Sequence, residues 1–357
     1  MHLSFSTRDR QVSLNKKKFE TMKKNKKILN DPVYGFIDMP TGTMYEIVEH
    51  PYFQRLRRIK QLGMSCMVYP GATHSRFLHT LGSFHLTQNA VKTLIEKGVS
   101  ISNEEADAVL FAILLHDIGH GPFSHALEGM FAPGIQHEEI SMAFMHYYNK
   151  KYNGQLDLAI EVFSGRYKEH FLHDLVSSQL DTDRLDYLKR DSFFTGVSEG
   201  VISTDRIIKM LNVVNDELVV DIKGLYSVEK FLIARRLMYW QVYLHKTVVA
   251  AEQLMRNIIT RARELAINKY EIFCSPALHF FLTCQNVSID NQMLTQFAAL
   301  DDSDIISAIK VWQHHSDLVL SKLSQMYIQR NLFKIELQKK PFDPQRIDDM
   351  QKGISKK

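Results

Sequence analysis

Four side chains within ten residues dominate the chemistry that this sequence can support. The segment HDIGHGPFSH holds His116, Asp117, His120 and His125 directly after an apolar stretch. A buried imidazole or carboxylate without a partner costs several kcal/mol. A divalent first-row metal ion removes that cost, because both groups are good ligands for it. The residue types and their spacing therefore predict a metal site rather than a set of hydrogen-bonded core histidines.

The apolar stretch before this motif is predicted to be a deeply buried helix that ends at Leu115. Ser102 and Glu105 have the spacing of a capping box at its start. Apolar residues then recur at helical spacing and also occupy the opposite face. Gly119 and Gly121 are expected to stop the helix and let the chain turn sharply. This turn should deliver the two later histidines of the motif to the same point as the first histidine and aspartate.

A mononuclear metal site takes about four protein ligands, so two more are needed. His79 is the best-placed earlier histidine, on a helix predicted over 74–97 and on the same face as Arg76. A carboxylate from a later helix, predicted over 168–191, should complete the set, and Asp183 in LDTDRLDYLKRD is the choice. Two histidines and two carboxylates suit iron, manganese or zinc. The predicted ligands are His79, His116, Asp117 and Asp183.

Composition places the 357 residues among ordinary globular proteins, with 45% hydrophobic and 24% charged residues. No apolar run approaches the roughly 20 residues that cross a bilayer, and the N-terminus has no signal-peptide pattern. Three scattered cysteines predict reduced thiols in the cytoplasm. Residues 1–27 carry a net charge of +7 and the remainder −3, so nucleic acid is not the expected partner.

The coarse pattern predicts an all-α protein with one small β-hairpin around 211–222, where VVNDELVVDI flanks an Asn215-Asp216 turn. A turn-rich segment could add a small strand pair around 33–37. Four parts are expected: a basic flexible tail over 1–29, a core over 30–200, a helical portion over 201–333, and a polar tail over 334–357. The third part is predicted to hold a very long helix over 227–268 and then three or four short helices.

These motifs resemble the HD superfamily of metal-dependent phosphohydrolases, in which H…HD…D is the ligand pattern. QRLRRIKQLG, YPGATHSRFLHTLG, HDIGHGPFSH, HE and LDTDRLDYLKRD also occur in the order seen in the deoxynucleoside triphosphate (dNTP) triphosphohydrolases. The resemblance covers roughly residues 28–265 and is greatest to the branch whose mammalian member joins a SAM domain to the HD domain. It implies an HD-domain helical fold and hydrolysis of a dNTP to a deoxynucleoside and inorganic triphosphate.

The resemblance also assigns roles to residues of this chain. A catalytic group around the α-phosphate would comprise His120, His125, His137 and Glu138, with Glu128 polarising one histidine. The triphosphate would be held by Arg76, Arg184, Tyr187 and Arg235. The sugar would meet Gln61 and Asp191 at its 3′-hydroxyl and Tyr243 at its 2′-position. Arg184 replaces a lysine that is frequent in the family, which keeps the charge and changes its geometry.

Partners follow from the same resemblance. Mg²⁺ should accompany the triphosphate, and the 201–333 portion should complete the substrate pocket and an oligomer interface. The expected assembly is a homo-oligomer, dimer or tetramer, whose interface could hold an activating nucleotide.

The chemistry is consistent with this assignment. A triphosphate carries about four negative charges, which three arginines can neutralise, and a bound metal ion acidifies water toward neutrality. His125 is the first choice to protonate the departing oxygen, since imidazole titrates in the right range.

Two alternatives stay open. An HD phosphohydrolase acting on nucleoside monophosphates or cyclic nucleotides would need fewer arginines, so Arg184 and Arg235 count against it. A non-catalytic HD protein that binds metal or nucleic acid would not require the histidine group.

Overall fold

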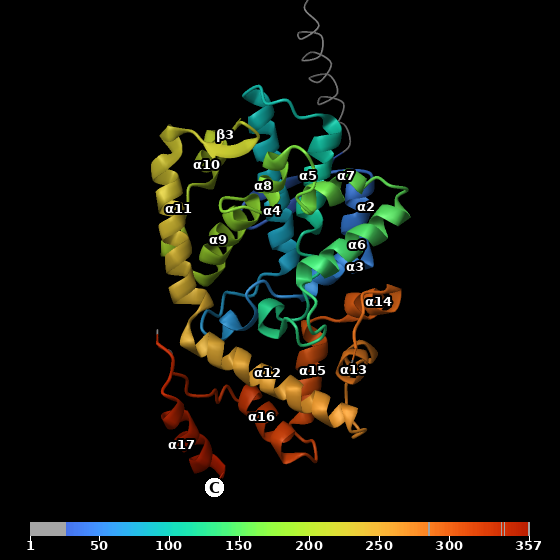
Figure 1. Cartoon of the computed structure of the whole chain (residues 1–357), viewed down its shortest axis with the longest axis vertical. Helices are drawn as coiled ribbons and strands as arrows, with labels where there is room; N and C mark the ends of the chain where they lie inside the picture. Colours follow the sequence, from blue (N-terminus) through green and yellow to red (C-terminus); the bar gives the residue numbers. More distant parts are fainter. Residues whose placement is uncertain (1–25, 285, 337, 339, 356–357) are drawn as a thin grey trace, which may run out of the picture.

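The computed structural model describes residues 26–284, 286–336, 338 and 340–355 of the chain. Helices dominate it, and its strands form two small two-stranded sheets. Figure 1 shows an upper group of helices around α4 and α5 and a lower group that contains α12, α13, α15 and α16. The predicted all-α class with a small hairpin is confirmed.

Both sheets are antiparallel hairpins. β1 (Lys26–Asp31) pairs with β2 (Gly35–Pro40), and β3 (Leu211–Val214) pairs with β4 (Glu217–Val220) around the predicted turn. The strand pair expected around 33–37 is present as the hairpin of β1 and β2, and its turn lies between Asp31 and Gly35. The backbone N–H groups of Val33 and Tyr34 both donate to Asp31 Oδ1 and close this turn. β1 begins inside the predicted 1–29 tail, so that boundary was wrong; residues 1–25 lie outside the described part.

Three helices form the centre of the upper group. α4 (Arg76–Glu96) packs against α5 (Asn103–Leu115) and against α9 (Thr182–Thr195). α5 begins with the predicted capping box, in which Ser102 and Glu105 each accept from the other's backbone N–H. Every residue of α5 from 108 to 115 is buried. The helix therefore brings the chain to its HD motif in the interior of the molecule.

Further helices surround this centre: α2 (Thr43–Glu49), α3 (Pro51–Gln54), α6 (His137–Lys151), α7 (Asp157–Phe163), α8 (His170–Val176) and α10 (Thr204–Met210). The single helix predicted over 168–191 was wrong, because α8 ends at Val176 and α9 begins at Thr182. Asp181 lies in the break, and its Oδ1 accepts from the backbone N–H of Arg184. Such a side chain competes with the helical ladder and favours a new helix start.

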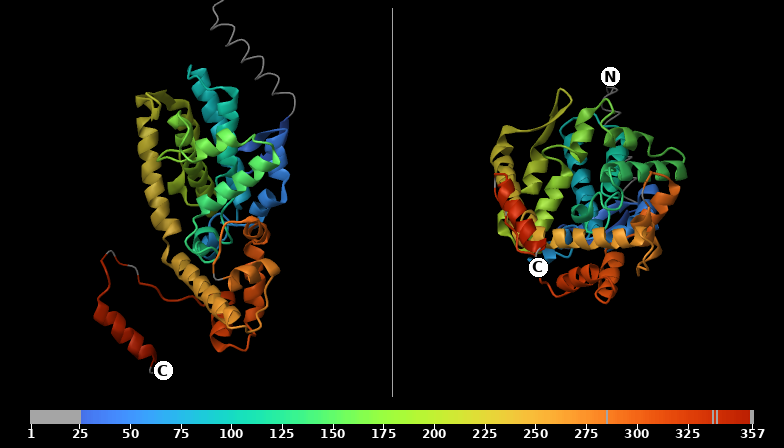
Figure 2. Two further views of the ribbon diagram at one scale, coloured as in Figure 1. Left: turned by 45° about the vertical axis from the view of Figure 1, so that its right-hand side comes forward. Right: turned by 60° about the horizontal axis from the view of Figure 1, so that its bottom comes forward.

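The very long helix predicted over 227–268 was also wrong. α11 (Leu225–Met238) passes into a π-helical turn at Tyr239–Tyr243, and α12 (Lys246–Ile267) starts anew after His245. The ring Nδ1 of His245 accepts from the backbone N–H of Thr247 and caps α12. Figures 1 and 2 show α12 running across the lower part of the molecule at a steep angle to α11. One continuous apolar pattern in the sequence thus forms two separate helices, α11 and α12, that run in different directions.

The C-terminal portion contains the expected short helices: α13 (Pro276–Thr283), α14 (Asn291–Ala299), α15 (Asp302–Trp312) and α16 (Leu318–Ile328). A further helix, α17 (Pro344–Ser355), lies within the segment predicted as a polar tail. Figure 2 shows α17 standing away from the helices of the lower group. No helix in the described part of the chain is both long enough and apolar enough to span a membrane.

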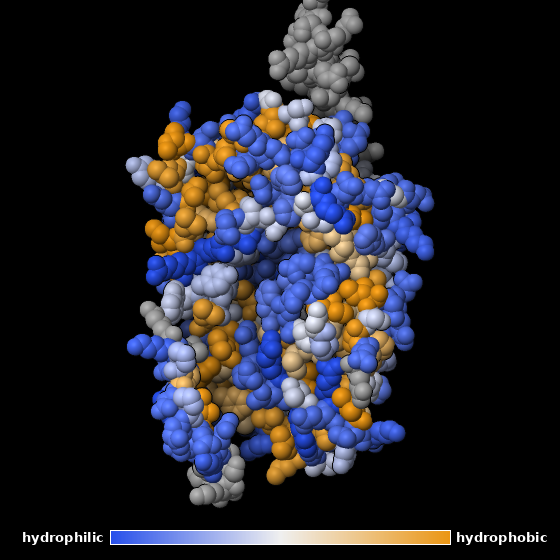
Figure 3. Space-filling view, in the orientation of Figure 1, coloured by the Kyte–Doolittle hydropathy of each residue, from blue (hydrophilic) through white to orange (hydrophobic). Residues whose placement is uncertain are grey.

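One face of the molecule keeps large apolar side chains in contact with solvent. Tyr226 and Ile233 on α11 are 81% and 60% exposed, and Leu225 and Leu232 are about half exposed. Figure 3 shows apolar residues gathered where Figure 1 draws α11. Extended exposed apolar patches of this kind mark interaction surfaces, so this helix is a candidate for contact with another protein chain.

Candidate metal centre and substrate cavity

The four predicted metal ligands converge on one point. His79 comes from α4, His116 and Asp117 directly follow α5, and Asp183 lies in the first turn of α9. His79 Nε2 is 3.0 Å from Asp183 Oδ1 and 3.5 Å from Asp117 Oδ2. His116 Nε2 is 3.5 Å from the same Asp183 oxygen and 3.4 Å from Asp117 Oδ1. One ion between these atoms could take a ligand from each side chain.

The other ring nitrogen of each histidine is held from outside. His79 Nδ1 donates to Asp186 Oδ2 at 2.7 Å, and His116 Nδ1 donates to the carbonyl oxygen of Ile113 at 2.6 Å. Such outward bonds orient a ligating imidazole and raise its basicity. Both Nε2 atoms are buried, and each faces the carboxylates of Asp117 and Asp183. The donor set therefore fits a divalent first-row ion.

Without a bound ion, the carboxylates around His79 favour its protonated form. Burial lowers the pKa of His79, but hydrogen bonds with Asp183 and Asp186 outweigh it and raise that pKa to about 10. Burial likewise raises the pKa of Asp183, and hydrogen bonds from His116 and His79 reverse this and hold it below its usual value. These shifts favour a protonated His79 beside ionised carboxylates at neutral pH.

Binding of a dication is therefore expected to release a proton, because only the neutral imidazole is a ligand. Titration of metal-free protein with Mn²⁺ at pH 7, in buffers of different ionisation enthalpy, measures the number of protons released. The observed heat should change with the buffer in the native protein and not in Asp183→Asn. A buffer-independent heat for the native protein would contradict the protonated state of His79.

The turn after the HD pair is built differently from the prediction. The residues with left-handed backbone are Phe123 and Ser124, each with φ of 55°, and not the glycines. The backbone N–H of Phe123 donates to Asp302 Oδ1, and Arg76 Nε donates to Ser124 Oγ, so two side chains hold this strained turn. Gly119 is needed for a close approach, since a Cβ there would collide with the carbonyl oxygen of His137.

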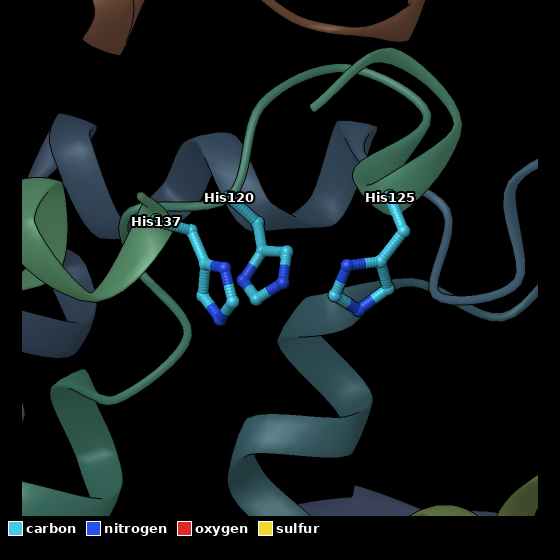
Figure 4. Close-up of side chains that lie close together, drawn as sticks. All are labelled: His120, His125 and His137. Atoms are coloured by element: carbon cyan, nitrogen blue, oxygen red, sulfur yellow. The ribbon is translucent and has the colours of Figure 1, made fainter. Parts of the chain in front are cut away.

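This turn and the start of α6 gather a second group of histidines. The ring centroids of His120 and His137 are 3.9 Å apart, and the ring of His125 lies 5.0 Å from His120 and 5.6 Å from His137. Figure 4 shows the rings of His120 and His137 side by side, with the ring of His125 facing them across a gap. We call His120, His125 and His137 the histidine cluster.

Glu128 joins two members of the histidine cluster. Its carboxylate accepts from His125 Nδ1 at 2.9 Å and from His137 Nδ1 at 2.6 Å. The hydrogen bond from His125, with a smaller contribution from His137, lowers the pKa of Glu128 to about 2. Glu128 is therefore an anion at any physiological pH, and it fixes the tautomer of both imidazoles with their Nε2 atoms turned away from it. The predicted polarising role of Glu128 has a geometric basis.

A cavity of about 550 Å³ connects the two histidine groups. Fourteen of the sixteen predicted site residues line it: Gln61, Arg76, His79, His116, Asp117, His120, His125, His137, Glu138, Asp183, Arg184, Tyr187, Arg235 and Tyr243. Glu128 lies behind the histidine cluster. Asp191 is buried, and its two oxygens contact Tyr243 and His74 rather than the cavity.

The three cavity arginines already have partners. Arg184 forms an ion pair with Asp181, Arg76 forms one with Asp117, and Arg235 Nη1 donates to Gln179 Oε1 at 3.0 Å. Each must share or exchange that partner to bind an anion. The buried Gln61 Oε1 has no partner among the described residues, so it can accept a hydrogen bond from a bound molecule.

Sequence reasoning missed three supporting residues. Asp186 orients His79, and its signal was its position one helical turn after Asp183. His74 Nε2 contacts Asp191 at 2.8 Å, and Arg55, fully buried, donates to the carbonyl oxygens of Ile118 and His120. The partners of His74 and Arg55 lie more than sixty residues away in the chain, so no local sequence pattern predicts these contacts.

Comparison with known proteins places these motifs in context. The protein-family model described as "HD domain" matches residues 76–191, and the model described as "HD associated region" matches residues 202–276. The uncharacterized protein YwfO of Bacillus subtilis is 33% identical over 86% of this chain and 71% of its own length. The deoxynucleoside triphosphate triphosphohydrolase SAMHD1 of Homo sapiens is 34% identical over 54% of this chain and 37% of its own. The crystal structure of a phosphohydrolase from Bacteroides thetaiotaomicron matches with 55% identity and a TM-score of 0.89, over 93% of this chain and 83% of that one.

Proposed function

This chain belongs to the HD-domain family of metal-dependent phosphohydrolases, and we propose from that premise that it hydrolyses dNTPs to deoxynucleosides and inorganic triphosphate. We call the four predicted metal ligands, His79, His116, Asp117 and Asp183, the His79–Asp183 centre. The proposal rests on one cavity of about 550 Å³ that joins this centre, the histidine cluster and three arginines. The first group suits a metal ion, and the arginines suit a polyphosphate.

The charge of the cavity favours a triphosphate over a monophosphate. Arg76, Arg184 and Arg235 come from α4, α9 and α11, so their cationic groups line different sides of the cavity. A monophosphate could engage one or two such groups, whereas a triphosphate with about four negative charges can engage all three. The relative named for this activity, human SAMHD1, supports the same substrate class.

The proposed reaction is attack of water on the α-phosphorus. The bond from phosphorus to the 5′-oxygen breaks, that oxygen takes a proton, and triphosphate and a deoxynucleoside result. A divalent ion at the His79–Asp183 centre supplies Lewis-acid activation and neutralises charge. We assign the transfer of that proton to Nε2 of His125, because Glu128 accepts from its Nδ1–H and fixes that tautomer.

Sugar selection is assigned to Tyr243. Its hydroxyl donates to Asp191 Oδ2 at 2.7 Å, and His74 holds the other oxygen of Asp191, so the phenol ring is fixed at the cavity wall. A fixed aromatic ring against C2′ leaves no room for a ribose hydroxyl. In this role Asp191 positions Tyr243, and Gln61 is the group free to accept from the 3′-hydroxyl.

The test of the proposed function is product identity. Purified protein with Mn²⁺ and Mg²⁺ should convert dGTP to deoxyguanosine and triphosphate in a 1:1 ratio, and should leave dGMP unchanged. Chelator-treated protein is the control. Release of pyrophosphate or orthophosphate from dGTP, or hydrolysis of dGMP at a comparable rate, would overturn the assignment in favour of another phosphohydrolase.

We also propose that the enzyme is a cytoplasmic homo-oligomer with α11 at an interface between copies. The exposed apolar side chains of Leu225, Tyr226, Leu232 and Ile233 support a protein contact along that helix. Measurement of the native mass, with Tyr226→Lys and Ile233→Lys introduced together, tests whether that face holds copies together.

A further inference from the structure

We propose that the histidine cluster is a second metal site, which takes a borderline transition ion such as Zn²⁺ and thereby excludes the substrate. Whether the ion binds depends on the three histidines alone and not on what the enzyme hydrolyses. The expected inhibition rests on the proposed function, because it assumes that the cluster faces the α-phosphate.

The cluster has the spacing of a three-histidine site. One ring nitrogen from each of His120, His125 and His137 lies within 4.8 Å of the other two. A Zn²⁺ ion bonds imidazole nitrogen at about 2.0–2.1 Å, so the three side chains must rotate to bring one nitrogen of each within reach of a single ion. Figure 4 shows the ring of His125 across a gap from the adjacent rings of His120 and His137, and an ion that joins all three would lie in that gap.

The state of the rings favours ligation. The Nδ1 atoms of His125 and His137 donate to Glu128, which leaves their Nε2 lone pairs available. His120 is 3% exposed, and no described residue hydrogen-bonds to its Nε2. A carboxylate behind two histidines is the arrangement that orients imidazoles in zinc proteins. Because Nδ1 of this ring faces Asp117 Oδ1 at 3.3 Å, Nε2 is the nitrogen left to bind an ion.

The ligand set also decides which ion binds. Three neutral nitrogen donors suit Zn²⁺, Ni²⁺ or Cu²⁺ and are poor ligands for Mg²⁺, which prefers oxygen. The histidine cluster is thus expected to prefer different metal ions from the His79–Asp183 centre, where two carboxylates add hard oxygen donors. His125, whose side chain is 67% exposed, leaves the cluster open to solvent on one side.

Occupation by an ion and contact with a phosphate exclude each other at every ring. A histidine nitrogen that donates a proton to a phosphate oxygen has no lone pair for a metal, and a ligating nitrogen has no proton to donate. Excess Zn²⁺ should therefore compete with dNTP and raise its apparent KM, while excess Mg²⁺ should not.

The experiment is equilibrium dialysis of the full-length protein against Zn²⁺, followed by metal analysis. The native protein should bind about two equivalents. Asp183→Asn should lose the ion of the His79–Asp183 centre and keep the second. His125→Ala should keep the first and lose the second, and Glu128→Gln should weaken the second about 10- to 100-fold. His146→Ala, an exposed histidine on α6, is the matched control and should retain both.

The outcomes separate this inference from the proposed function. One equivalent in the native protein, or a second equivalent that survives in His125→Ala, overturns the second site whatever the enzyme hydrolyses. Two equivalents with the expected variant pattern establish it even if no dNTP is cleaved. Circular dichroism of the folded variants ensures that a lost equivalent reflects a lost ligand, since His125 is exposed and its removal leaves the core intact.

Discussion

Asp183→Asn is expected to lower kcat for the proposed hydrolysis of dNTPs by about 10³-fold and to abolish tight metal binding. The Asp183 Oδ1 lies between His79 Nε2 at 3.0 Å and His116 Nε2 at 3.5 Å, at the centre of the proposed site. Metal-ion catalysis contributes several kcal/mol, and each 1.36 kcal/mol is a tenfold change in rate. Loss of about 4 kcal/mol of transition-state stabilisation corresponds to about 10³-fold.

The fold should tolerate this change. Asp181, and not Asp183, caps α9, so the helix start is kept. The asparagine has nearly the same volume and can still hydrogen-bond to His79. Steady-state kinetics and metal analysis measure the effect, with Asp205→Asn on the exposed side of α10 as the matched control. An Asp183→Asn protein with native turnover would show that the His79–Asp183 centre is not the catalytic one.

Arg190→Ala is expected to destabilise the protein by about 3–5 kcal/mol, the range for breaking a buried ion pair. The Arg190 side chain is fully buried, and its Nη1 donates to Asp31 Oδ2 at 2.7 Å. Its Nε and Nη2 donate to the two oxygens of Asp186 at 2.9 and 3.0 Å. Removal of the guanidinium leaves the buried Asp31 carboxylate without its ionic partner and leaves Asp186 paired only with His79, the residue that it orients.

Urea denaturation measures this loss as a lower free energy of unfolding. Arg206→Ala, an exposed arginine on α10, is the control and should stay within about 0.5 kcal/mol of the native protein. Gly82→Ala should act in the same direction as Arg190→Ala, because a Cβ on Gly82 would collide with the Asp186 carboxylate and the Arg190 guanidinium. Native stability in both variants would show that this buried pair contributes nothing to the fold.

The chemistry of the centre could be predicted from the sequence because its signals are contiguous. A capping box, an apolar helix and an adjacent His-Asp pair are all read from neighbouring residues, and the structure places them as expected. His79 and Asp183 were identifiable by type and by their position on predicted helices. The prediction of four ligands therefore needed only local rules and the preference of metal ions for nitrogen and oxygen donors.

Local rules were weaker where the chain breaks its own pattern. The apolar periodicity from 227 to 268 is continuous, and nothing in it marks the π-helical turn at Tyr239–Tyr243 that redirects α12. The sharp turn after the HD pair was expected at Gly119 and Gly121, yet the residues with left-handed backbone there are Phe123 and Ser124. Asp302, far along the chain, holds Phe123 through its backbone N–H. Tertiary contacts decided both features.

The sequence by itself predicted the four metal ligands, because ligand type, helix capping and helical spacing depend on near neighbours, and its resemblance to the HD superfamily assigned the other site residues. Only the tertiary structure decided how those residues are held. The bonds from Asp186 to His79, from His74 to Asp191 and from Arg55 to the HD turn join segments distant in the chain. The physical reason is that a buried polar group must find a partner in three dimensions, and which partner it meets depends on the packing of the whole core.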